Sequence, residues 1–144
     1  MGVFTRFKRS SEGFRQLVEL WESTPLERRK KMIDIGMVED PEYSKKVMIY
    51  MMTFEDILKM NDMELAELVA KAPPRTIAYA ISTADEATQL RFLKNAKPQI
   101  MAQIRDGLMA KIGPREVGGA RLNLIICARG LEHAGFIQTK KIPI

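Results

Sequence analysis

Few residues in this sequence have the types and spacing that catalysis or metal binding requires. His133 is the only histidine, and it lies near a predicted helix C-terminus, where the helix dipole favours a cation. We expect a surface or capping histidine there, not a catalytic base. Cys127 is the only cysteine, which excludes an internal disulfide, and its apolar helix face predicts a buried, inert thiol. Because no histidine, cysteine and carboxylate cluster has metal-ligand spacing, we expect no enzyme activity, no metal and no cofactor.

The pair Gly118-Gly119 is the only other feature with a chemical reading. A phosphate-binding loop lies between a strand and a helix, whereas this pair lies inside a helical pattern. Each glycine weakens a helix by roughly 1 kcal/mol. Close packing against a neighbouring helix and divergence without purpose both remain open as explanations.

Composition limits the protein to a small set of classes. The chain has 144 residues, of which 46% are hydrophobic, so it fits one domain or two small helical units that share a core. Ten methionines favour adaptable packing and a partner-binding surface. The formal charge of +5 is spread among mixed charges, which argues against a dedicated nucleic-acid binder. No apolar run reaches membrane-spanning length and no signal peptide is visible. We expect a cytoplasmic protein that meets a membrane only indirectly.

Residues 97–131 carry the clearest helical pattern. Pro98 suits a first helical position, and Ile100, Ile104 and Leu108 then recur every four residues. Gly113-Pro114 ends this helix and begins the next. The second helix has apolar residues at three and four spacing, widened enough to predict burial on more than one side: Val117, Ala120, Leu122, Leu124, Ile125, Ile126, Cys127 and Leu131.

The N-terminal part predicts a flexible arm and a small helical unit. Residues 1–13 form a basic arm that is either frayed or in contact with an anionic surface. Residues 14–50 read as three helices. We expect Thr24 and Glu27 to form a capping box around Pro25, and Asp40-Pro41 to begin the third helix. The cations from Arg28 to Lys31 form either a solvated face or a contact for an acidic partner.

The remaining helices are predicted from their start signals. Thr53 with Asp56, Asn61 with Glu64, and Thr83 with Glu86 are each expected to cap a helix. A compact helix is expected over residues 75–81, and residues 138–144 form a tail without helical period. No convincing strand pair is present, so the expected fold class is all-α.

The order of short motifs resembles the C-terminal half of the flagellar motor switch FliG family. The resemblance covers most of the chain, from Phe14 to Ile137. Its central motif is the run Met51, Met52, Thr53 and Phe54, similar to the family's Met-Phe-x-Phe hinge. The other motifs keep the family's order and near-equal spacing: Glu39 to Glu42, Glu55 to Ile57, Phe92 to Asn95, Arg105-Asp106, Gly113-Pro114, and Leu131-Glu132 with Gly135.

The resemblance implies an armadillo-like right-handed helical superhelix. It would contain a small armadillo-like unit over residues 14–50, a hinge over residues 51–54 and a six-helix domain over residues 55–137. In the family, the penultimate long helix faces the stator protein MotA, and the armadillo unit binds the switch protein FliM and neighbouring copies of itself. The implied stator-facing residues are here Lys97, Arg105, Asp106, Lys111, Arg115 and Glu116.

Several positions depart from the family's charge pattern. The family's lysine falls at Ser82, its helix arginine at Gln99, and its acidic pair at Asp106 and Gly107. Its arginine after Gly-Pro falls near Glu116, with Arg115 beside it. Two hypotheses therefore stand. The first is a rotor or switch component, either a fragment or a divergent paralogue, and Met1-Gly2 slightly favours the paralogue. The second is a helical adaptor that kept the fold without torque generation.

Overall fold

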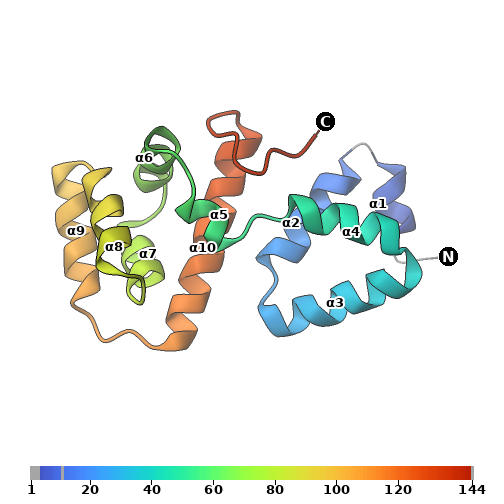
Figure 1. The fold of residues 1–144 in the computed structure, drawn as a ribbon, viewed down its shortest axis with the longest axis horizontal. Coiled ribbons are helices and arrows are strands. Elements are labelled where there is room, and N and C mark those ends of the chain that lie inside the picture. The colour runs from blue at the N-terminus through green and yellow to red at the C-terminus, as the bar shows by residue number, and fades with distance from the viewer. Residues whose placement is uncertain (1–3, 11, 144) are drawn as a thin grey trace.

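The computed structural model describes residues 4–10 and 12–143, and every regular element in these ranges is a helix. The expected all-α fold is therefore confirmed. The helices form two units along the long axis of the molecule, and the long helix α10 (Pro114–His133) lies between them (Figure 1). The described helices include none that is long and apolar enough to cross a membrane.

The N-terminal unit consists of α1 (Thr5–Arg9), α2 (Gly13–Ser23), α3 (Leu26–Glu39) and α4 (Pro41–Tyr50). Helix α2 buries one face because apolar residues recur at helical spacing. Its Trp21 side chain is 1% exposed and contacts the ring of Phe4 edge to face, at 5.9 Å between ring centroids. The buried residues of this core are Phe4, Phe7, Leu17, Val18, Trp21, Val47, Met51 and Ile142.

The described part of the expected flexible arm includes the short helix α1. Phe4 and Phe7 are buried, because α1 packs on α2 and places both rings against the core. Gly36 of α3 makes this possible: a Cβ at Gly36 would lie 2.6 Å from the Phe4 ring. Residues 1–3 and 11 of the arm, Met1-Gly2 among them, lie outside the described residues.

Of the four expected helix caps, those at Thr53 and Asn61 are present and those at Thr24 and Thr83 are wrong, while Asp40 begins its helix as expected and also caps it. Asp40, Thr53 and Asn61 each accept a backbone N–H at the start of their helix. Thr24 instead donates its hydroxyl to the carbonyl of Leu20 at the end of α2, and α3 begins after Pro25 without a side-chain cap. Asp85 takes the place expected for Thr83, since its carboxylate accepts the Thr88 N–H at 2.8 Å.

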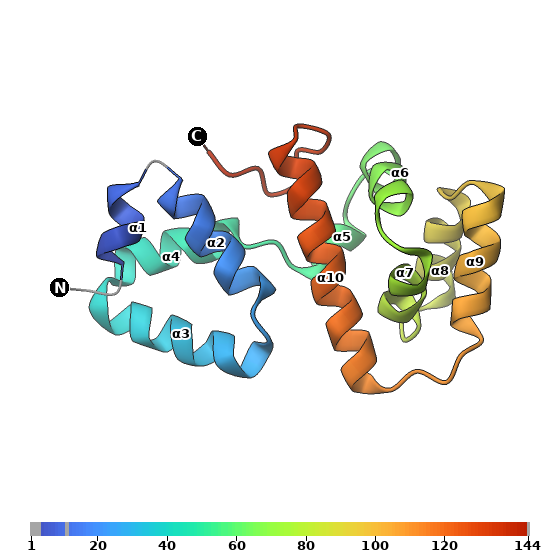
Figure 2. The ribbon, with the colours of Figure 1, turned by 180° about the vertical axis from the view of Figure 1, so that it is seen from behind.

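The C-terminal unit contains α5 (Phe54–Leu58), α6 (Asp62–Lys71), α7 (Pro74–Ile81), α8 (Glu86–Lys94), α9 (Pro98–Leu108) and α10. Helix α7 packs between α9 and α10, and its Ile77, Ala78, Ala80 and Ile81 are fully buried. Helix α10 also contacts α2 of the other unit, and the view from behind shows it running along the joint (Figure 2). Gly113-Pro114 begins α10 as expected, but it does not end the preceding helix, because α9 already ends at Leu108.

The two units are joined in the chain by residues 51–53. Met51 packs in the N-terminal core, whereas Met52 packs in the C-terminal core and is 1% exposed. Thr53 forms a capping box with Asp56, and Phe54 lies under the guanidinium of Arg121 at 4.2 Å. Each core therefore takes in one of the two methionines. Movement at this hinge stays a prediction.

Truncation of Met52 tests its place in the core. Met52→Ala is expected to lower the free energy of unfolding by about 2–5 kcal/mol, because it leaves a cavity among buried side chains. The measurement is urea unfolding followed by circular dichroism. Met63→Ala is the matched control, since Met63 is 80% exposed and its loss should cost less than about 0.5 kcal/mol. Equal small effects for both variants would contradict the packing of Met52.

Candidate protein-interaction surface

Helix α9 is held by one apolar stripe and leaves its other sides in solvent. Pro98 occupies its first turn, as the sequence predicts. Ile104 is fully buried, while Ile100, Met101 and Leu108 are partly buried against the same core. The exposed sides carry Lys97, Gln99, Gln103, Arg105 and Asp106. The helix therefore presents a polar ridge on a rigid base.

Two grooves flank this ridge. The groove between α8 and α9, about 460 Å³, has Leu90, Leu93 and Met101 in its lining, with Lys94 and Arg105 as exposed cations. The groove between α7 and α9, about 490 Å³, is lined by Arg75, Tyr79, Gln103, Asp106 and Gly107. Arg105 and Asp106 are adjacent in sequence but line different grooves. The first groove is consequently basic, and the second carries charges of both signs.

All six charged residues of the predicted surface are exposed, and one of them, Glu116, has a structural role. Within residues 4–10 and 12–143, no ion pair involves Lys97, Arg105, Asp106, Lys111 or Arg115. Glu116 has a structural task, because its carboxylate accepts the Gly113 N–H at 3.2 Å and caps α10. Lys111 lies in the connection between α9 and α10, and Arg115 lies in the first turn of α10. The six predicted residues thus follow α9 and its connection to α10, without meeting at one point.

Position 107 has no room for a side chain. A Cβ at Gly107 would lie 2.6 Å from the Cβ of Ala78, so α7 and α9 approach too closely for a side chain at this position. The pair Gly118-Gly119 behaves differently, since a Cβ at either residue would meet nothing within 4 Å. Close packing, which the sequence left open for that pair, is therefore wrong there.

His133 and Cys127, the only histidine and the only cysteine of the sequence, lie in ordinary environments. His133 is exposed at the end of α10. Cys127 is partly buried, and burial raises the pKa of its thiol, which keeps it protonated and unreactive at neutral pH. Neither residue lines the two grooves beside α9, and both are far from α9 in the sequence.

The position of this surface relative to the N-terminal unit depends on a buried ionic network. Arg129 of α10 is 2% exposed, and Glu22 of α2 is 1% exposed. The Nε of Arg129 donates to one Glu22 oxygen at 2.7 Å, and a terminal nitrogen donates to the other at 2.9 Å. The same guanidinium donates to the carbonyl of Tyr50 at 2.9 Å, and Glu22 accepts the Met52 N–H at 2.8 Å. The network therefore joins α2, α10 and the connection between the units.

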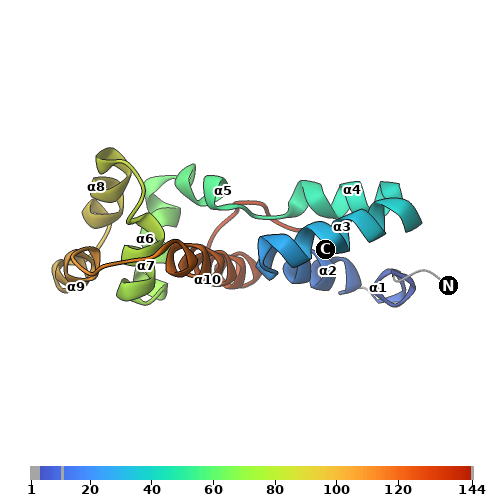
Figure 3. The ribbon, with the colours of Figure 1, turned by 90° about the horizontal axis from the view of Figure 1, so that it is seen from below.

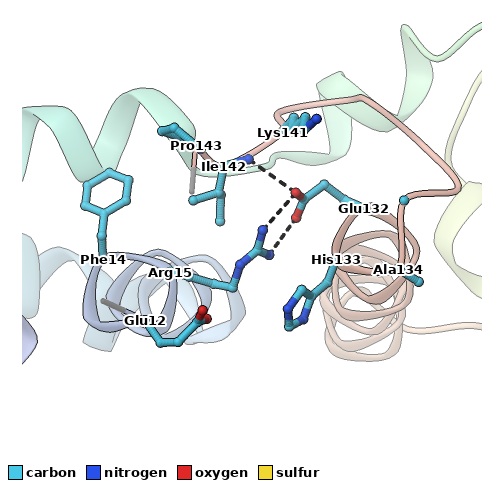
Figure 4. A pocket seen from close by; sticks show the side chains of 10 residues that line it. Glu12, Phe14, Arg15, Glu132, His133, Ala134, Lys141, Ile142 and Pro143 are labelled. Carbon is cyan, nitrogen blue, oxygen red and sulfur yellow. Dashed lines mark hydrogen bonds and ion pairs between the residues drawn. The ribbon is translucent and has the colours of Figure 1, made fainter. Parts of the chain in front are cut away.

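Glu132 extends the network to the molecular surface. It accepts from Arg129 at 2.9 Å and, in a two-point contact, from Arg15 of α2 at 2.7 and 3.0 Å (Figure 4). Burial alone would raise the pKa of Glu132, but the hydrogen bonds from Arg15 and Arg129 outweigh it and lower the pKa from 4.5 to about 2. Glu132 therefore stays ionised at neutral pH, with two guanidinium partners.

This network was not predicted from the sequence. A signal existed, because Arg129 continues the apolar positions Leu122 and Ile125 along one helix face, where a charge is unusual unless it is paired. Glu22 likewise follows Trp21 on the buried face of α2. The partners could not be assigned, since 107 residues separate Glu22 from Arg129.

The fold is an all-helical, armadillo-like arrangement of helices. The sequence model described as the FliG C-terminal domain matches residues 37–139. The chain belongs to this family.

Individual relatives agree with the assignment. The flagellar motor switch protein FliG of Thermotoga maritima is 30% identical over 110 residues, covering 75% of this chain and 33% of that protein. FliG of Aquifex aeolicus is 30% identical over 130 residues, covering 88% of this chain and 39% of that protein. The chain therefore spans little more than a third of the length of these curated relatives.

Solved structures show the same fold. The crystal structure of residues 86–343 of FliG from H. pylori aligns with a TM-score of 0.65 at 21% identity, over 90% of this chain and 62% of that one. Full-length FliG from Aquifex aeolicus aligns with a TM-score of 0.55 at 23% identity, over 88% of this chain and 40% of that one.

Removal of the central guanidinium should destabilise the fold strongly. Arg129→Ala is expected to lower the free energy of unfolding by about 3–5 kcal/mol, because it leaves two buried carboxylates without their partner. Chemical denaturation measures the loss. Arg105→Ala removes an exposed arginine and serves as the control, with a change within about 0.5 kcal/mol. An Arg129 variant that unfolds at the wild-type urea concentration would refute the role of the network.

The network also predicts an acid dependence. The folded-state pKa of Glu132 is about 2 against an ordinary 4.5, so its contribution to stability is present above pH 4.5 and is lost as the pH falls towards 2. The measurement is the free energy of unfolding as a function of pH in this window. Glu132→Gln removes the titrating group and should give a flatter pH dependence; a slope equal to that of wild type would contradict the assignment.

Proposed function

We propose that the chain acts as a rotor component of a bacterial flagellar motor switch, through contacts with other proteins. Membership of the FliG C-terminal domain family supports this most directly. The ridge of α9 supplies the contact, because its charges are exposed and form no ion pairs within the described residues. The place of action is the cytoplasmic side of a flagellar motor, with no direct membrane contact.

The proposed stator contact is a MotA-like protein on α9 and its two grooves. The basic α8–α9 groove, with apolar residues between Lys94 and Arg105, fits a segment that carries both apolar and acidic side chains. The α7–α9 groove adds Asp106 and Arg75 for partners of either sign. Lys97, Lys111 and Arg115 extend the positive potential along the ridge.

The proposed rotor contacts lie on the N-terminal unit. Helix α3 exposes Leu26 (74%), Ile35 (54%) and Val38 (86%), which is unusual for a solvated helix face and supports binding to a FliM-like switch protein or to another copy of the chain. The basic residues between Leu26 and Ile35 are mostly exposed beside them, so an acidic partner would be favoured.

A helical adaptor without torque generation is the second candidate. The uncharged Gln99 is exposed on α9, and Gly107 cannot carry a side chain without displacing Ala78. Two positions that carry a charge in the family are therefore uncharged on this ridge. The adaptor hypothesis keeps the docking surfaces and omits the coupling to stator motion.

A charge exchange on α9 separates specific pairing from general attraction. The double variant Arg105→Glu, Asp106→Lys keeps the net charge but inverts the sign facing each groove. Binding to the cytoplasmic loop of a candidate stator should weaken several-fold at low salt, since exposed ion pairs contribute about 0–1 kcal/mol each. The difference should shrink as salt increases. Fluorescence titration at two salt concentrations and swarming of a strain with the variant measure the effect.

The matched control exchanges two exposed charges of α6, in the variant Glu67→Lys, Lys71→Glu. It preserves net charge in the same unit and should leave binding unchanged. If the α9 variant binds and swims like wild type, α9 is not the stator contact and the adaptor hypothesis is favoured. If both variants weaken binding equally, the attraction is general.

A further inference from the structure

The segment after α10, residues 136–143, forms a strap across the joint between the units. The chain reverses at Gly135, whose φ of +88° is in the region that favours glycine. The Phe136 N–H then donates to the carbonyl of Leu131 at 2.9 Å and closes the helix end. From there the strap leaves α10 and runs towards the N-terminal unit (Figure 2), and the view from below shows it spanning the two units (Figure 3).

One end of the strap is anchored in the C-terminal unit. Ile137 is 1% exposed and belongs to the core of that unit. Glu64 of α6 accepts the Gln138 N–H at 2.5 Å and the Thr139 hydroxyl at 2.8 Å. The carboxylate of Glu64 was expected to complete a cap with Asn61; it holds the strap instead.

The other end is anchored in the N-terminal unit. Ile142 is 1% exposed and is part of that unit's core, with Trp21 and Val47. The ammonium of Lys140 donates to the carbonyl of Ile49 at the end of α4, at 3.0 Å. Only four residues thus separate two isoleucines that are buried in different cores.

The strap is also bonded to the ionic network. The Lys140 carbonyl accepts from Arg129 at 2.9 Å, and the Ile142 N–H donates to Glu132 at 3.3 Å. Lys140 has a φ of 51°, a conformation that costs free energy for a residue with a side chain. The surrounding contacts therefore hold the strap in a shape that it would not adopt alone.

We propose that this strap is an intramolecular latch that sets the relative orientation of the two units. The units are otherwise linked by the extended residues 51–53 and by the contact of α2 with α10. The strap adds a third bridge, anchored on both sides of the joint. Its release, with Ile142 leaving the N-terminal core, frees the units to reorient about residues 51–53. The latch is independent of which partner binds α9.

The test measures distances between the units in the full chain. Spin labels are attached at Lys30→Cys on α3 and Glu67→Cys on α6, both exposed positions, in a Cys127→Ser background. Pulsed electron paramagnetic resonance should give one narrow distance distribution for the parent chain. Ile142→Asp should broaden it about twofold or more, because a buried carboxylate is expelled from an apolar core. The helix content of this variant, measured by circular dichroism, should equal that of the parent chain.

Phe136→Asp is the matched control, since Phe136 is in the strap but is 62% exposed; its distribution should equal that of the parent. A second variant inserts Gly-Ser-Gly-Ser between Thr139 and Lys140, which keeps every buried side chain but separates the anchor on α6 from the anchor on α4. It should also broaden the distribution, and it decides the question if Ile142→Asp loses helix content. A narrow, parent-like distribution in the insertion variant, or in a folded Ile142→Asp variant, overturns the latch.

Discussion

The structure depends on one buried guanidinium. An arginine side chain has five N–H donors, and Arg129 directs them to five acceptors: both oxygens of Glu22, one oxygen of Glu132, and the carbonyls of Tyr50 and Lys140. A buried charge is tolerated only when its hydrogen bonds are met. The acceptors come from α2, the end of α4, α10 and the strap. All four elements must therefore be in place together, so the joint forms only when both units are folded.

The ridge of α9 takes its position from this arrangement through close packing. Helix α10 packs on α7, and α7 packs on α9, where Gly107 allows the contact with Ala78. The chain of contacts is made of small and fully buried residues, which deform little. The charged ridge is thereby held at a fixed place relative to α10, although it has no contact with Arg129 itself. The ridge of α9 and the joint are thus connected through three packed helices.

The sequence predicts the helices well because their signals are local. Periodic apolar residues identify α9 and α10, and side-chain caps at Asp40, Thr53 and Asn61 lie within three residues of their partners. The failures were of two kinds. At Thr83 the neighbouring Asp85 takes the capping role, and at Thr24 the hydroxyl bonds back to the carbonyl of Leu20 and leaves α3 without a side-chain cap. The ionic network and the strap depend on partners far apart in the chain, such as Glu64 with Thr139, 75 positions apart, and no periodicity records such pairs. The exposed charges of α9 were found by resemblance, whereas their division between two grooves required the fold.

The adjacent methionines of the joint restrict the chain in another way. Met51 belongs to one core and Met52 to the other, so the boundary between the cores falls at a single peptide bond. An insertion or deletion of one residue here would shift the chain so that Met51 and Met52 could not both reach their cores. The Met52 N–H would also lose its hydrogen bond to Glu22. The units can change composition as long as their cores stay filled, but the length of the joint is fixed to the residue. Sequence drift in such a protein is therefore expected to substitute residues at this boundary and not to change their number.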